Sequence, residues 1–217
     1  MNGVVPGATK RRSLAFAVAG AVVATAFALG AGFTIKDRCT THAWDGFQYR
    51  SSCYNDIFAL YSFRGLHEEP FPYVHGDGKL SDNDGQSEAG DLEYPVGTGY
   101  LVGVVALVVD NGQAFFRTTA IILAALALAG TALLVRMAHD RRRVLFFALG
   151  PSLVLYAFHN WDLLAVALLC AGLFAFRRGS DGWTGVFIGL GAASKVFPGL
   201  ILPALVLSRV KDVGAGP

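Results

Sequence analysis

The chain has 217 residues, of which 53% are hydrophobic and only 16% are charged, and its mean hydropathy is +0.47. Soluble globular proteins average about 25% charged residues, so this composition excludes an ordinary soluble protein and predicts an all-α polytopic membrane protein. The net charge is +2, but 11 of the 16 acidic residues lie between Lys36 and Glu93. The apolar composition predicts the lipid bilayer as a partner. Because the largest polar segment is acidic, we predict no nucleic-acid partner.

The N-terminal segment is basic and precedes an apolar run of membrane-spanning length. Residues 1–12 end in Lys10, Arg11 and Arg12, and residues 13–35 are largely apolar. A secretory signal peptide begins in the same way, but its apolar core is typically about 7–15 residues long, whereas a span needs about 20. We therefore predict a cytoplasmic N-terminus at 1–12, a first transmembrane helix at 13–35, and an outer loop after it.

Residues 36–114 form the predicted outer loop, which contains two of the three cysteines. An oxidising exterior would allow Cys39 and Cys53 to form a disulfide, whereas a cytosolic loop would leave both reduced. Cys170 lies in an apolar segment and is most simply a packing residue. The middle of the loop, 75–91, is rich in Gly, Asp, Ser and Asn and shows no helical or strand period.

Two interfacial helices are predicted within this loop. Ile57, Leu60 and Tyr61 follow a helical spacing, which indicates an amphipathic helix near 54–66 with Asp56 in its first turn. The apolar stretch near 95–109 is short for a membrane crossing and fits an interfacial or re-entrant element.

Residues 115–209 are predicted to form a transmembrane helical region with a broken last segment. If 95–109 does not cross, the helix from 115 to 135 runs inward and places the arginines at 136 and 141–143 in the cytoplasm, as the positive-inside rule prefers. Later spans then leave 159–162 outside and 177–178 inside. Lys195 and Pro198 interrupt the last apolar segment, as in a broken helix that lines a polar cavity. Residues 210–217 form a tail, and we expect the chain to be truncated there.

Ionisable groups at membrane depth are costly and are functional candidates by default. Asp56 is a candidate general base, because a partly desolvated carboxylate can take a proton from an attacking hydroxyl. It could equally cap its helix or pair with Arg64. Glu93 could orient a sugar hydroxyl, or could merely precede the turn at Pro95.

The other candidates lie after the outer loop. Asp162, with Asn160 two residues before it, suits a helix N-terminus as well as a binding site. Lys195 could bind a lipid phosphate as a point charge, or could snorkel or neutralise an internal acid. For His159 we favour an ordinary interfacial position. No zinc-ligand spacing, phosphate-binding glycine loop or nucleophile elbow occurs in the sequence, so we predict no metal and no cofactor.

The order of these motifs resembles the GT-C superfamily of polytopic glycosyltransferases, especially family 87 proteins related to actinobacterial polyprenol-phosphate-mannose-dependent mannosyltransferases. The matching segments span most of the chain and are 53–57, 60–61, 64–66, 72–73, 92–96, 160–165 and 189–198.

This resemblance implies a GT-C-like bundle in the plasma membrane, in which a large first outer loop supplies the catalytic carboxylate. The implied reaction is an inverting transfer of a sugar, mannose by analogy, from a polyprenyl-phosphate donor to a glycan or glycolipid acceptor on the extracytoplasmic side. Asp56 matches the catalytic position. The predicted substrate-binding residues are Arg64, Glu93, Tyr94, Asn160, Asp162 and Lys195.

Family members are usually longer, so an alternative is a non-catalytic membrane subunit or inactive fragment that binds a lipid carrier. A secondary transporter is a weaker alternative, because the large outer loop has no inverted counterpart.

Overall fold

The computed structural model describes residues 6–63, 66, 71 and 94–214, and this part of the chain contains helices and turns but no β-strand. Two of its helical segments, Arg11–Thr40 and Gly112–Met137, are long and apolar enough to cross a membrane. The predicted all-α membrane fold is confirmed.

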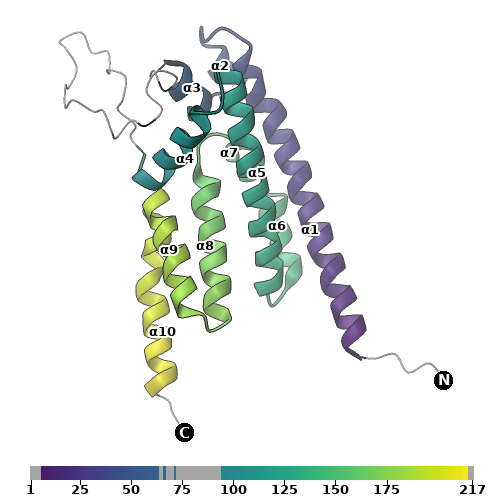
Figure 1. Cartoon of the computed structure of the whole chain (residues 1–217). Helices are drawn as coiled ribbons and strands as arrows, with labels where there is room; N and C mark the ends of the chain where they lie inside the picture. Colours follow the sequence, from purple (N-terminus) through teal and green to yellow (C-terminus); the bar gives the residue numbers. More distant parts are fainter. Residues whose placement is uncertain (1–5, 64–65, 67–70, 72–93, 215–217) are drawn as a thin grey trace.

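The long helices run up and down the molecule, and several of the short ones gather at one end (Figure 1). The long helices are α1 (Pro6–Asp37), α5 (Gly112–Met137), α8 (Asp162–Arg177), α9 (Asp181–Ser194) and α10 (Leu202–Gly214). The short helices α2 (Phe47–Arg50), α3 (Asp56–Phe63) and α4 (Val96–Ala106) lie at what we call the loop end, whereas both chain termini lie at the opposite, terminal end.

Helix α5 illustrates how the sequence determines where a helix begins, how long it is and what it packs against. Asn111 caps its N-terminus by accepting the N–H of Ala114 at 2.9 Å, as expected for a residue type that satisfies the first unpaired amides of a helix. At 26 residues, α5 is about 39 Å long, enough for the roughly 30 Å apolar core of a bilayer. It packs against α1 through a buried hydrogen bond between the Thr25 and Thr131 hydroxyls, at 3.0 Å.

The apolar segment after Arg143 is not one continuous helix. It is divided into a 3-10 turn (Arg141–Arg143), α6 (Val144–Ala148) and α7 (Pro151–Tyr156). The break falls at Gly150, whose backbone is extended (ψ 134°). Pro151 explains it, because proline disfavours helical geometry in the residue before it and cannot donate an N–H.

The last apolar segment also breaks, at Lys195. Lys195 is extended (φ −159°, ψ 136°), and a 3-10 helix over Phe197–Ile201 then turns the chain into α10. The structure therefore forms two separate helices here, with the polar break at the loop end (Figure 1).

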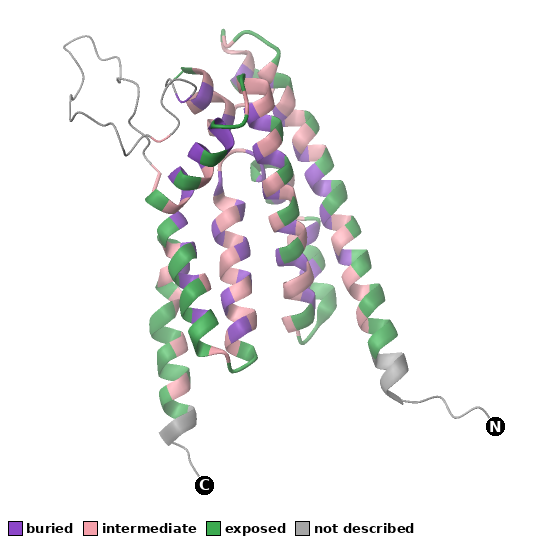
Figure 2. Ribbon diagram, viewed as in Figure 1, coloured by how far each residue is buried: buried purple, intermediate pink, exposed green. Residues whose placement is uncertain are grey.

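Most of the buried core lies toward the loop end. Phe115, Phe116 and Ile57 are fully buried, and Trp161 and Phe158 are 2% exposed. By contrast, α10 is largely exposed (Figure 2). The short helices α3 and α4 are thus fixed on a packed base of aromatic side chains.

Candidate active site at the loop end

Asp56 is the first residue of α3, and its backbone is held on both sides. Asn55, fully buried, caps the helix by accepting the Phe58 N–H at 2.8 Å. The Asp56 N–H donates to the His159 carbonyl at 2.7 Å, which ties α3 to the turn between α7 and α8. Because these contacts use the backbone, the Asp56 carboxylate is not required to cap its own helix.

The Asp56 carboxylate accepts a hydrogen bond from Tyr94, with 2.5 Å between the Tyr94 hydroxyl and Oδ2. The Tyr94 ring packs edge-on against Trp161, with 5.0 Å between the ring centroids. The pKa of Tyr94 is raised well above its ordinary value, first by burial, then by the hydrogen bond to Asp56 and the negative charges of Asp56 and Asp162. Tyr94 therefore stays protonated and acts as a donor to Asp56.

Asp162 begins α8 and forms an ion pair with Lys195. The side chain of Asn160 accepts the Asp162 N–H at 3.0 Å. Lys195 and Asp162 are 39% and 44% exposed, so solvent screens this pair and its contribution to stability is small. Of the two interpretations of Lys195 from the sequence, neutralisation of an acid agrees with this ion pair.

A close contact between α4 and α9 positions Lys195. Thr98 donates from its hydroxyl to the Ser194 carbonyl at 2.7 Å. An added Cβ at Gly97 would lie 2.8 Å from the Ala193 backbone, so only glycine permits this approach. The segment that contains Tyr94 is thereby fixed beside the break that contains Lys195.

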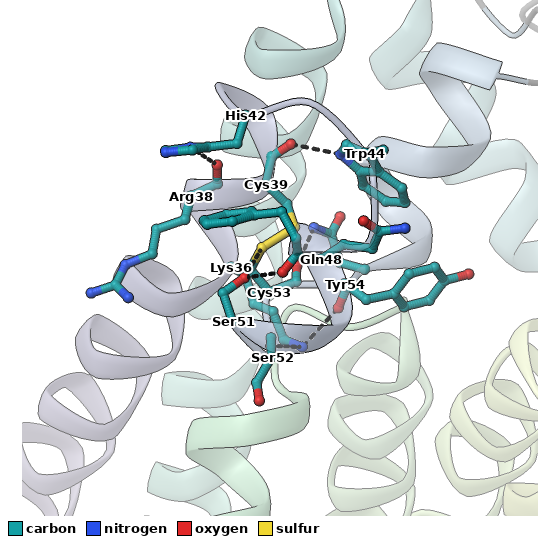
Figure 3. The surroundings of a disulfide bond; sticks show 12 residues. Lys36, Arg38, Cys39, His42, Trp44, Gln48, Ser51, Ser52, Cys53 and Tyr54 are labelled. Carbon is teal, nitrogen blue, oxygen red and sulfur yellow. Dashed lines mark hydrogen bonds between the residues drawn. A yellow bond between two sulfur atoms is a disulfide. The ribbon is translucent and has the colours of Figure 1, made fainter.

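A disulfide and a buried lysine hold the chain just before Asp56 (Figure 3). Cys39 and Cys53 are bonded, with 5.5 Å between their Cα atoms. Lys36, only 5% exposed, donates from Nζ to the carbonyls of Ser52 at 3.0 Å and Tyr54 at 2.7 Å. The end of α1 is thus held against the segment of chain that leads into α3.

Four chain segments therefore converge at the loop end: the start of α3, the segment just before α4, the turn before α8, and the break after α9. A comparison with protein families matches residues 93–213 to glycosyltransferase family 87. This match covers more than half of the chain. The chain belongs to glycosyltransferase family 87. No curated protein and no solved structure matches it.

Membership of glycosyltransferase family 87 makes this chain a membrane glycosyltransferase. The matched region includes Tyr94, Asn160, Asp162 and Lys195, whereas Asp56 and the disulfide lie before it. The link between the two parts is structural, through the Tyr94–Asp56 hydrogen bond.

The structure brings together five of the predicted site residues: Asp56, Tyr94, Asn160, Asp162 and Lys195. The other two, Arg64 and Glu93, lie outside the described residues. In the described part of the chain, no group of three or more His, Cys, Asp or Glu side chains could hold a metal ion.

Sequence reasoning missed three residues of this site in the glycosyltransferase. Asn55 could have been found, because Asn is a preferred helix cap and directly precedes the acidic first turn. The roles of Lys36 and Trp161 had no local signal. Lys36 bonds to carbonyls 16 and 18 residues away, and the buried Trp161 indole N–H has no hydrogen-bond partner in the described part of the chain.

Proposed function

We propose that this family 87 glycosyltransferase is a multi-pass protein of the plasma membrane that transfers a sugar, mannose by resemblance, from a polyprenyl-phosphate donor to a glycan or glycolipid hydroxyl. The observation that carries the proposal is the Asp56 carboxylate, hydrogen-bonded to Tyr94 at 2.5 Å beside the Lys195–Asp162 ion pair.

The distribution of charge supports an extracytoplasmic site. Arginines cluster at the terminal end of the helices, at positions 136, 141–143, 177–178 and 209. Positively charged loops favour the cytoplasm, and the Cys39–Cys53 disulfide at the loop end favours an oxidising exterior. Both features support the proposal that the loop end, with Asp56, lies outside.

Asp56 is suited to act as the general base. Tyr94 occupies Oδ2, so Oδ1 is the oxygen that an acceptor hydroxyl would approach. As the acceptor oxygen forms a bond to the anomeric carbon, its proton passes to Asp56, the bond from that carbon to the phosphate oxygen breaks, and its electron pair leaves on the lipid phosphate. Attack opposite the leaving group inverts the anomeric configuration.

Lys195 is suited to stabilise the departing phosphate. Its ammonium already contacts a carboxylate oxygen of Asp162, so Asp162 holds it in place before the donor binds. Because both side chains are partly exposed, exchanging one anionic oxygen for another has a modest cost. Asn160 orients Asp162, and Arg64 and Glu93 remain proposed donor ligands.

The donor class and the stereochemistry test this function. Purified protein in proteoliposomes is supplied with polyprenyl-phosphate mannose or with a nucleotide-linked mannose, together with a lipid extract as acceptor. We expect transfer only from the lipid-phosphate donor, with inversion detected by NMR of the product.

A non-catalytic lipid-carrier-binding subunit is the competing function. It predicts saturable binding of polyprenyl phosphate without a transferred sugar, and that result would overturn the enzymatic proposal.

A further inference from the structure

We propose that a pocket at the loop end, which we call the Tyr156 pocket, binds the sugar ring of the acceptor. This inference rests on the proposed glycosyl transfer and adds a site to it. The pocket has a volume of about 330 Å³, within the range of small-molecule sites. It is lined by Lys36, Gln48, Tyr49, Ser52, Tyr54, Leu155, Tyr156 and His159.

The walls of the Tyr156 pocket are a connected series of rings. Tyr49 and Tyr54 are stacked with 5.7 Å between centroids, Tyr54 lies 5.5 Å from His159, and Tyr156 lies 5.6 Å from His159. Tyr49 and Tyr156 are 69% and 62% exposed. A sugar ring has an apolar C–H face and a rim of hydroxyls, and flat aromatic walls with polar tips fit both parts.

Polar groups between these rings can bind the hydroxyl rim. Gln48 is 8% exposed, and its Oε1 accepts the Gly46 N–H at 3.1 Å. The Gln48 NH₂ group donates no hydrogen bond within the described part of the chain, so its N–H groups can donate to a ligand. Ser52 and His159 supply a hydroxyl and an imidazole on the same lining. A few polar groups in a mainly apolar recess are the usual composition of a small-molecule site.

The Tyr156 pocket adjoins the proposed base on the side away from Lys195. His159 lines the pocket and accepts the Asp56 N–H, and Tyr54 lies two residues before Asp56. The pocket is lined by the ends of α1 and α7, by α2 and by the segment 52–54, whereas Lys195 follows α9. Helices α1 and α9 lie on opposite sides of the molecule in Figure 1. Inversion requires the acceptor and the leaving phosphate on opposite faces of the donor sugar, so this pocket is on the acceptor side.

A phosphate group is the less suitable occupant. Lys36 is the one cation on the described lining, and it is 5% exposed and already donates to two carbonyls. The other lining side chains are neutral aromatic, amide, hydroxyl or aliphatic groups, together with His159. The chemistry of the wall therefore favours a neutral sugar ring over an anion.

Ligand-observed NMR on the protein in nanodiscs tests the pocket without depending on turnover. The probes are octyl α-mannoside and octyl β-glucoside, with octanol as a control for membrane partition and octyl phosphate as the anionic rival. The variants are Tyr156→Ala, the matched control Phe146→Ala, which removes an 84% exposed ring in α6, and Asp56→Asn.

We expect at least one glycoside to bind the wild type and to bind Tyr156→Ala about tenfold more weakly. Phe146→Ala should bind it as the wild type does. In the transfer assay, Tyr156→Ala should raise the acceptor KM and leave the donor KM unchanged.

Three results would overturn the inference: no glycoside binds, Tyr156→Ala binds it normally, or only octyl phosphate shows dependence on Tyr156. The binding result is separable from the proposed reaction. If Asp56→Asn retained full transfer while glycoside binding still required Tyr156, the role of Asp56 would be wrong and the sugar pocket would stand.

Discussion

At the loop end, the backbone around Asp56 is fixed by a disulfide, a buried lysine and the Asn55 cap, whereas at the terminal end the helices finish in exposed, arginine-rich turns. The same apolar helices connect both ends. The difference shows that side-chain positions are fixed mainly at the loop end. Hydrogen bonds between distant segments position a few side chains at the loop end, while the charges at the terminal end suit only the orientation of the chain in the bilayer.

Loss of the Lys195 ammonium should have the largest effect among changes that spare Asp56. We expect Lys195→Met to lower the transfer rate by about 10²–10³-fold, because one charge-stabilising donor to the leaving phosphate is lost. The control Lys211→Met removes an exposed lysine at the terminal end and should change the rate less than about twofold.

A double variant separates the two interpretations of Lys195. If Lys195 only neutralised Asp162, then adding Asp162→Asn to Lys195→Met would restore the rate. We expect no recovery, because the phosphate would still lack its ligand.

Removal of the disulfide should act on stability. Cys39 and Cys53 are separated by 14 residues, and a loop of this size contributes roughly 3 kcal/mol. Cys39→Ser should therefore lower the free energy of unfolding by about that amount in a denaturant titration. Reductant should destabilise the wild type and leave the stability of Cys39→Ser unchanged. A reduced wild type that stayed stable and fully active would show that the disulfide is not required.

Tyr94→Phe should have a smaller effect, which depends on the hydrogen bond to Asp56. We expect a rate roughly tenfold lower, since hydrogen bonds to charged groups contribute about 1.5–3 kcal/mol. Tyr100→Phe, on an exposed ring in α4, is the control.

The pH dependence of stability gives a second measure of Tyr94. Its folded pKa is raised above the ordinary value near 10, so its contribution is fully present below about pH 10 and declines as the pH rises above it. The stability difference between the wild type and Tyr94→Phe should follow this course. A difference that instead grew above pH 10 would contradict the donor role.

Local patterns predicted the helices but not the contacts between them. The apolar run of α1, the length of α5 and the helix that starts at Asp56 follow from residue type and spacing. Membership of family 87 confirmed the resemblance read from the motifs. Tyr94 and Asp56 are 38 residues apart and Lys195 and Asp162 are 33 apart, and no periodicity encodes such pairs. The split at Gly150 follows from Pro151, a local signal that was not used to divide this segment.

The most direct measurement of the central claim compares Asp56→Asn with Asp45→Asn in sealed vesicles of known orientation, using polyprenyl-phosphate mannose as donor. Asp45 lies in the same segment of the chain but is exposed and paired with Arg50. If Asp56 is the extracytoplasmic base, Asp56→Asn lowers the transfer rate at that face by about 10²–10⁴-fold, and Asp45→Asn retains it. Native-rate transfer by Asp56→Asn would contradict the assignment.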